Sequence, residues 1–304
     1  MKKFLFTIIV FLAVGLIAGE IIARIFVLTT EVPNRKIDEY GIQRYIPNQD
    51  GYYKGGDHTW QVNKNGWVGP LPKSEDNLIT IIGDSFIENF MNPDECHQMA
   101  YLKEKVPSYN FTEAARSGVT LIEAFEISKQ FYVKKPELQI IYLDESDLKQ
   151  SLTDIGRVGD VTQLNLKENK IVYGVMRSPG LKKIIYNLKF PFYLYRRFSG
   201  SLAKKTPINT NEEEKLKEDS YIDEYKALLE YIKSNYDTTN TLLVLKPHTE
   251  RSVVDLLKSL DFNILLLNDE GDKNWSFEYD HHWTCYGHER AASQVASYIK
   301  SNMK

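Results

Sequence analysis

The first residues whose types could do chemistry are Gly83, Asp84 and Ser85, at the end of the apolar run Leu78–Gly83. Glycine permits a tight turn after a strand, which would expose the Ser85 hydroxyl at the carboxyl edge of a sheet. If a helix begins there, its N-terminal N–H groups favour negative charge developing beside Ser85. Ser85 is therefore a candidate nucleophile, although Asp84 and Ser85 are also common helix N-cap residues.

A second polar segment, residues 280–288, lies near the C-terminus and contains Asp280 and His282. A serine nucleophile needs a base to accept its proton, and imidazole is the usual one. The imidazole in turn needs a carboxylate that holds its tautomer and stabilises its cation. Asp280, two residues before His282, can supply that carboxylate from the same loop. Ser85, His282 and Asp280 are thus the predicted catalytic residues.

Metal binding by His281, His282 and His288 is an alternative for this segment. The neighbouring acidic residues and cysteines have no standard zinc spacing, however, and an HExxH motif is absent. We therefore predict a site without a metal and without another cofactor.

Together these two segments resemble the SGNH (GDSL-type) hydrolase superfamily, over about residues 77–304. Gly-Asp-Ser follows the first strand, and Asp-x-His-x-x-x-x-Gly stands just before the last helix. In that family a glycine falls five positions after the catalytic histidine. Gly287 has this spacing from His282, so the resemblance selects His282 over His281 as the base.

The resemblance also implies an oxyanion hole with three donors. Two are the backbone N–H groups of Ser85 and of Gly118, which follows the second strand. The third is an Asn side chain in a Gly-x-Asn-Asp block, where this chain has Asp-Glu-Ser-Asp with Ser146 at the Asn position. Serine offers one donor on a shorter arm, and losing one oxyanion-hole donor costs about 10²–10³ in rate. The two backbone donors, or Asn89, would then have to compensate.

The elements that must position these residues are apolar runs alternating with helical stretches. Continuous apolar runs predict parallel strands buried on both faces. The runs are Leu78–Gly83, Ser108–Thr112, Leu138–Leu143, Thr241–Lys246 and Asn263–Leu267, and the helices are Glu95–Lys105, Leu121–Tyr132, Ile222–Tyr236, Arg251–Leu260 and Tyr286–Lys304. We predict an α/β fold, a flavodoxin-like three-layer sandwich with a mostly parallel central sheet and its ligand site beyond the carboxyl ends of the strands.

The N-terminal segment Phe4–Gly19 carries no charge and follows two lysines. If the helix continues to Leu28, Glu20 and Arg24 lie four apart on one face, where they can pair. A secretory apolar segment has about 7–15 residues and a membrane span roughly 20, so the length is intermediate. We favour an uncleaved transmembrane anchor over a signal segment or a buried core helix. By the positive-inside rule, the catalytic domain would then be extracytoplasmic, in the periplasm or at the cell surface.

The sequence thus divides into an anchor or uncleaved signal segment at 1–28, a stalk and N-terminal extension at 29–76, and the SGNH-like domain at 77–304. That domain has an insertion at about 149–219, which begins with a predicted hairpin at 161–174. The aromatic-rich stretch Leu181–Phe198 comes next, followed by a polar link at 206–215. For the aromatic stretch we favour a helix broken at Pro191 and packed on the domain, over a membrane-surface segment or a lid.

The charge balance and the cysteine count exclude further classes of protein. With 38 Lys+Arg against 41 Asp+Glu, the chain lacks the basic excess of a nucleic-acid binder. Its two cysteines exclude a disulfide scaffold, but Cys96 and Cys285 could flank the cleft either as a bridge or as two free thiols. Arg116, beside Gly118, would bind an anionic group of the substrate or pair with a carboxylate such as Asp147.

The leading functional hypothesis is a membrane-anchored, extracytoplasmic serine esterase that removes acyl groups from a polysaccharide or glycoconjugate through an acyl-enzyme. Its partners would be an acylated saccharide or another ester and the membrane, with no nucleic acid. One alternative is an O-acyltransferase on the same fold, supplied by a membrane acyl-donor protein. Another is an SGNH-fold binding protein that has lost activity, suggested by Ser146.

Overall fold

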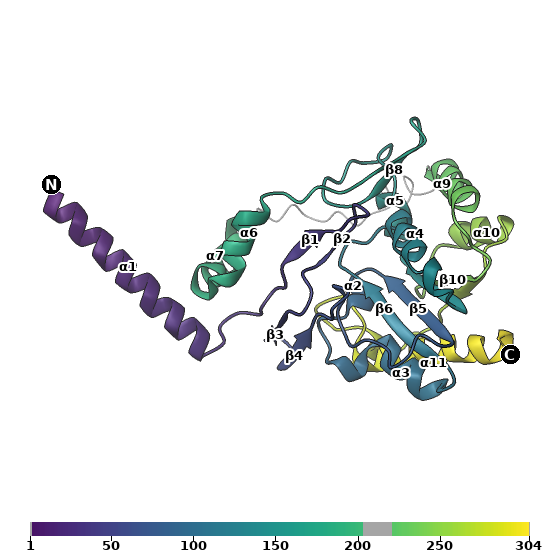
Figure 1. Ribbon diagram of the computed structural model, residues 1–304, viewed down its shortest axis with the longest axis horizontal. Helices are drawn as coiled ribbons and strands as arrows, with labels where there is room; N and C mark the ends of the chain where they lie inside the picture. Colours follow the sequence, from purple (N-terminus) through teal and green to yellow (C-terminus); the bar gives the residue numbers. More distant parts are fainter. Residues whose placement is uncertain (1, 203–220, 304) are drawn as a thin grey trace.

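The computed structural model describes residues 2–202 and 221–303, and shows a three-layer α/β domain preceded by a long N-terminal helix (Figure 1). Its central sheet has five parallel strands in the order β11-β10-β7-β5-β6. These are β5 (Leu78–Gly83), β6 (Asn110–Ala115), β7 (Leu138–Leu143), β10 (Thr241–Leu245) and β11 (Ile264–Leu266). Counted along the chain, the spatial order is 2-1-3-4-5, which is the flavodoxin-like order. The predicted fold class is confirmed.

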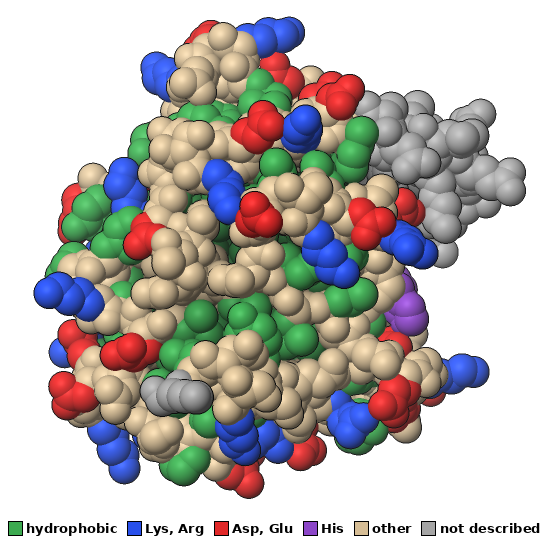
Figure 2. All heavy atoms as spheres, turned by 90° about the vertical axis from the view of Figure 1, so that its right-hand side faces the viewer, with side chains coloured by type: hydrophobic (Ala, Val, Ile, Leu, Met, Phe, Trp, Pro, Cys, Tyr) green, Lys and Arg blue, Asp and Glu red, His purple; other side chains and the backbone are tan. Residues whose placement is uncertain are grey.

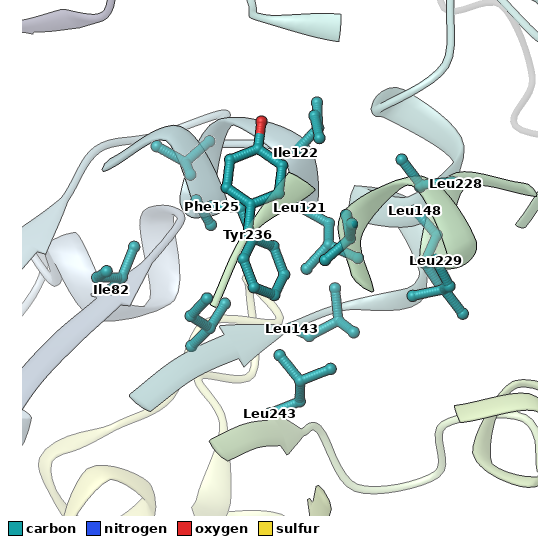
Figure 3. Close-up of a cluster of buried hydrophobic side chains, with 14 of the residues drawn as sticks. Ile82, Leu121, Ile122, Phe125, Leu143, Leu148, Leu228, Leu229, Tyr236 and Leu243 are labelled. Atoms are coloured by element: carbon teal, nitrogen blue, oxygen red, sulfur yellow. The ribbon is translucent and has the colours of Figure 1, made fainter. Parts of the chain in front are cut away.

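Both faces of the sheet are covered by helices, because side chains alternate between two apolar clusters along each strand. One face packs against α4 (Leu121–Gln130), α5 (Glu145–Gln150), α9 (Ile222–Asn235) and α10 (Arg251–Ser259). Figure 3 shows this core, with Phe125 and Tyr236 lying near Ile82, Leu143 and Leu243 of the strands. The other face packs against α3 (Gln98–Lys105) and α11 (Cys285–Asn302). This double burial explains why the strands are continuous apolar runs in the sequence.

The region before β5, which we expected to be a stalk that folds against the main domain, forms two small antiparallel sheets. They pair β1 (Arg35–Ile37) with β2 (Gln43–Tyr45), and β3 (Asp50–Tyr53) with β4 (His58–Gln61). Two of its apolar side chains, Ile42 and Trp67, are buried in the core cluster around α4. The extension is therefore packed on the main domain.

The insertion contains the expected hairpin and a pair of helices. The hairpin is β8 (Gln163–Asn165) with β9 (Lys170–Val172), and the helices are α6 (Pro179–Asn187) and α7 (Lys189–Leu202). The helical break is at Leu188, and not at Pro191 as predicted, because a proline in the first turn of a helix removes no internal hydrogen bond. The polar link at 206–215 lies outside the described residues.

The prediction that the aromatic stretch packs on the domain is also wrong for α7, which packs against the N-terminal helix. The Glu20 carboxylate accepts the backbone N–H groups of Lys189 and Phe190 at 3.0 and 2.8 Å. The Arg24 guanidinium donates to the Asn187 carbonyl at 2.8 Å. Free N–H groups at a helix start need an acceptor, and here a carboxylate from α1 supplies it.

Helix α1 (Lys2–Ile25) is long and apolar enough to cross a membrane, by length and composition, although a signal sequence meets the same criteria. Among its residues only Ala23 is buried, so the alternative of a core helix is wrong. Glu20 and Arg24 form the expected pair, with Arg24 Nε donating to Glu20 Oε1 at 2.8 Å.

A disulfide bond joins Cys96 to Cys285, with 5.0 Å between their Cα atoms. Cys96 ends η1 (Asp94–Cys96), shortly after Ser85 in the chain, and Cys285 is the first residue of α11. The bond connects segments 189 positions apart in the chain. It ties the start of the last helix to the region that follows Ser85.

We expect the double variant Cys96→Ala/Cys285→Ala to lose about 2–5 kcal/mol of unfolding free energy, because a cross-link over a long loop restricts the unfolded chain. Urea unfolding measures the loss. Adding a reductant to the oxidised wild type should lower its unfolding free energy by the same amount. The reductant should leave the unfolding free energy of the double variant unchanged. Equal midpoints for oxidised and reduced wild type would contradict the stabilising role.

Candidate active site

Ser85, His282 and Asp280 lie together at the carboxyl edge of the sheet. Ser85 is the first residue of α2 (Ser85–Glu88), directly after β5, and its Oγ lies 2.8 Å from His282 Nε2. His282 Nδ1 is hydrogen-bonded to Asp280 Oδ1, and the same oxygen accepts the His282 backbone N–H at 3.0 Å. A carboxylate on Nδ1 favours the tautomer with a proton there, which leaves Nε2 free to accept the serine proton.

The electrostatics of this loop favour an ionised Asp280. Partial burial alone would raise the pKa of Asp280, but the hydrogen bonds from the His282 ring and backbone outweigh it and lower the pKa. The side chains of His282 and Asp280 are 28% and 36% exposed, so a substrate can reach them from solvent.

Asp84 holds the turn that presents Ser85. Its carboxylate caps α2 by accepting the backbone N–H of Phe86 at 3.0 Å. The N-cap role therefore belongs to Asp84, and the Ser85 hydroxyl is left to contact His282.

The loop carrying His282 is held by aromatic packing and by one amide. The Phe86 ring stacks on the His282 imidazole, with centroids 4.7 Å apart and planes at 27°. Trp283 is buried, and its carbonyl accepts a hydrogen bond from Asn92 Nδ2 at 3.0 Å. Gly287 is needed because a Cβ there would lie 2.1 Å from the Trp275 carbonyl oxygen. These contacts give a physical reason for a glycine five residues after His282.

The loop after β6 presents Gly118 at a φ of +79°, which suits glycine. Next to it, the Glu88 carboxylate accepts the Ser117 backbone N–H at 2.9 Å and the Ser117 hydroxyl at 2.6 Å. Within the described part of the chain, the backbone N–H groups of Ser85 and Gly118 donate to no protein acceptor. Both remain available as oxyanion donors, and their role stays a prediction.

Ser146 is exposed and engages the helix cap beside it. Its backbone N–H donates to Asp144 Oδ1 at 2.9 Å, and its side chain also helps to lower the pKa of Asp144. The idea that Asn89 compensates is wrong. Asn89 is buried, and its amide donates to the Cys96 carbonyl at 3.1 Å. Its side chain therefore stabilises the segment after α2.

Lys246, which was not among the predicted site residues, directly follows β10 at the same edge. Lys246 Nζ lies 2.9 Å from Asp144 Oδ2 and 3.1 Å from the centroid of the Phe86 ring. A lysine at the end of a fully buried strand was the available signal, because carboxyl ends of parallel strands meet at the ligand site. Lys246 thus packs on the Phe86 ring, which in turn stacks on His282.

Lys246 also balances three carboxyl groups at this edge. Burial raises the pKa of Asp84 although the Lys246 charge opposes it. Burial and the nearby Asp84 charge raise the pKa of Asp147 well above its usual range. Burial would also raise the pKa of Asp144, but the Lys246 ammonium outweighs it and lowers the pKa. The ionised partner of Lys246 is therefore Asp144.

Arg116 is buried and pairs with a carboxylate, which is one of its two predicted roles, but the partner is Glu123 of α4 and not Asp147. Its Nε donates to the Gln43 carbonyl at 3.1 Å. With 1% of its side chain exposed, Arg116 cannot reach a substrate. It joins the N-terminal extension to the main domain instead.

The histidines considered as metal ligands do not cluster. His288 is buried, and Gln98 Nε2 lies 3.1 Å from its Nδ1. Burial lowers the pKa of His288 to about 3, so it stays neutral. Over residues 2–202 and 221–303, no group of three or more His, Cys, Asp or Glu is placed to hold a metal ion.

Several solved structures are similar to this chain at low sequence identity. TesA has 10% identity and a TM-score of 0.42, over 74% of this chain and 98% of its own. The psychrotrophic esterase EstA from Pseudoalteromonas sp. has 13% identity and a TM-score of 0.39, over 74% and 98%. A family two carbohydrate esterase from Clostridium thermocellum has 12% identity and a TM-score of 0.39, over 78% and 66%. No protein-family model and no curated protein matches this chain.

We expect Gly287→Ala to lower the unfolding free energy by about 1–3 kcal/mol, because the added methyl group must displace the Trp275 carbonyl. Thermal unfolding measures the loss. Gly156→Ala is the matched control, since a Cβ at Gly156 would meet no atom within 4 Å. If both variants unfold at the wild-type temperature, the close packing of Gly287 is not what holds the loop.

Proposed function

We propose that this chain is a serine ester hydrolase of the SGNH type, anchored to a membrane and acting outside the cytoplasm. The observation that carries the proposal is the hydrogen bond of 2.8 Å between Ser85 Oγ and His282 Nε2, with Asp280 on the other imidazole nitrogen. Acyl transfer through serine requires a nucleophile that is hydrogen-bonded to a base, and a carboxylate that orients the base. The five-stranded sheet places them where such folds bind ligands.

In the proposed reaction, His282 Nε2 accepts the Ser85 proton as Ser85 Oγ attacks the ester carbonyl. The backbone N–H groups of Ser85 and Gly118 donate to the oxyanion of the tetrahedral intermediate. The C–O bond of the ester then breaks, and the protonated His282 gives its proton to the leaving alcohol. Water then gives a proton to His282 as it attacks the carbonyl of the Ser85 acyl ester. The bond between the acyl carbon and Ser85 Oγ breaks, and His282 returns the proton to Ser85 Oγ, which releases the carboxylic acid and free Ser85. Asp280 stabilises the imidazolium in both halves.

The location rests on α1 and on the disulfide bond. A 24-residue apolar helix can span a bilayer, and disulfides persist in oxidising compartments outside the cytoplasm. An extracytoplasmic hydrolase next to a membrane suits acyl groups on a polysaccharide or glycoconjugate, and we propose this class as substrate.

The test is labelling of the full-length protein with a fluorophosphonate probe, which reacts with activated serines. We expect a single adduct at Ser85, found by peptide mass spectrometry. The adduct should be absent in Ser85→Ala and His282→Ala. His281→Ala is the matched control and should label like the wild type, because His281 is the exposed neighbour of His282. A folded wild-type protein without an adduct at Ser85 would refute the proposed nucleophile.

The replacement of Asn by Ser146 favours a second candidate, an SGNH-fold binding protein with impaired catalysis. We expect Ser146→Asn to raise kcat on a chromogenic acetate ester by up to about 10²-fold, because a longer amide arm can restore the third oxyanion donor. Ser146→Ala is the control and should leave kcat near the wild-type value, since the serine hydroxyl has a shorter arm than an amide and alanine keeps the backbone N–H that donates to Asp144.

A kcat for Ser146→Asn equal to or below that of wild type would show that this position does not complete the oxyanion hole. Fast hydrolysis by the wild type would exclude the binding-protein candidate. Addition of a saccharide acceptor to the same assay tests the acyltransferase alternative, which requires transfer to the acceptor above hydrolysis.

A further inference from the structure

The paired helices α6 and α7 have a charge pattern unlike the rest of the chain. Between residues 171 and 202 there is no Asp or Glu, and the basic residues are Arg177, Lys182, Lys183, Lys189, Arg196 and Arg197. By contrast, acidic and basic side chains alternate over the face of the molecule in Figure 2. A one-sign cluster of this kind attracts an anionic surface.

These helices also expose apolar side chains in a regular pattern. On α6, Leu181 and Ile184 lie on one face and are 58% and 59% exposed, and Leu188, directly after the helix, is 41% exposed. None of the nine residues of α6 is buried. On α7, Tyr195 is 62% exposed. Helices as short as α6 are only marginally stable in water by themselves. We therefore expect another surface to cover the exposed apolar side chains of α6.

The two helices sit at the end of the apolar helix α1 (Figure 1). Besides the contacts of Glu20 and Arg24, the Phe190 ring lies so close to Gly19 that a Cβ there would meet it at 2.6 Å. Nearby, Ile25 at the end of α1 and Phe26 directly after it are 69% and 68% exposed. The exposed apolar surface of α1 is therefore continued by α6 and α7 at the point where a span would leave the bilayer.

We propose that the basic, apolar surface of α6 and α7 docks onto the anionic lipid leaflet that the C-terminal end of α1 reaches. The inference rests on the proposed membrane anchor and is independent of the hydrolase activity. Apolar side chains on one face with lysine and arginine beside them are the pattern of helices lying in a membrane interface. The basic side chains would contact lipid phosphates while Leu181, Ile184 and Leu188 enter the acyl boundary.

A surface hollow of about 310 Å³ lies between α7 and the N-terminal extension, and it is lined by Lys54 and Gly55 together with Tyr193, Arg196 and Arg197. Two arginines of α7 thus stand beside a lysine of the extension, which adds basic charge next to the docking surface.

The test uses tryptophan fluorescence in the full chain, reconstituted into nanodiscs with brominated lipids that quench indole. Ile184→Trp probes the docking surface. Val133→Trp is the matched control, because Val133 is 82% exposed and lies before β7, at the opposite edge of the sheet. The native tryptophans Trp60, Trp67, Trp275 and Trp283 are buried, so the wild-type signal can be subtracted.

In discs containing phosphatidylglycerol, we expect quenching of Trp at 184 at least about twofold above quenching at 133, as for a side chain at the acyl boundary. Charge reversal by Lys182→Glu, Lys183→Glu and Arg197→Glu should reduce it to the level of the control. Equal quenching at 184 and 133 would overturn the proposal and would leave a protein partner to cover this face. A full chain that does not enter the discs would overturn it together with the anchor, while labelling of Ser85 reports separately on the hydrolase.

Discussion

The hydrogen bond between Ser85 Oγ and His282 Nε2 joins residues 197 positions apart, and its formation sets demands on most of the domain. The sheet order places β5 next to the middle of the sheet, so the turn after it opens at the shared carboxyl edge. The loop before α11 must then bring His282 to that edge, within hydrogen-bond distance of Ser85. Its position is set by the disulfide at Cys285, by the Asn92 amide on Trp283, and by the close packing of Gly287. Each of these contacts restrains a loop that would otherwise be free to move.

Charge at the carboxyl edge is the second constraint on the site. Three carboxyl groups meet there with a single ammonium, that of Lys246, and burial makes two of them hold their protons more readily. Asp144 keeps its charge because Lys246 is beside it, and the backbone N–H of Ser146 donates to the same carboxylate. The residue at the usual Asn position is thus part of a helix cap.

The N-terminal half of the chain relates the domain to the proposed membrane. The Glu20 carboxylate of α1 serves as the acceptor for the first N–H groups of α7, so the insertion is joined to the N-terminal helix. The extension contributes Ile42 and Trp67 to the core, and the buried Arg116 donates to the Gln43 carbonyl of β2. Tyr45 of the same extension is hydrogen-bonded to Glu88, whose carboxylate also holds the Ser117 loop beside Gly118. Segments that the sequence separates as anchor, stalk and insertion are therefore connected to the loops around Ser85.

The sequence by itself determined the five strands of the central sheet, the fold class and the identity of the three residues that meet. Burial on both faces forces continuous apolar runs, and a nucleophile, a base and a carboxylate are few enough to be found by type and spacing. The partners of Arg116, Asn89 and Ser146 could not be read in this way, because each polar side chain has several acceptors within reach of its loop. The disulfide, the contact of α7 with α1, and Lys246 beside Phe86 and Asp144 were decided only by the tertiary structure. These contacts join residues far apart in the chain, and local sequence patterns carry no signal about which distant groups pack together.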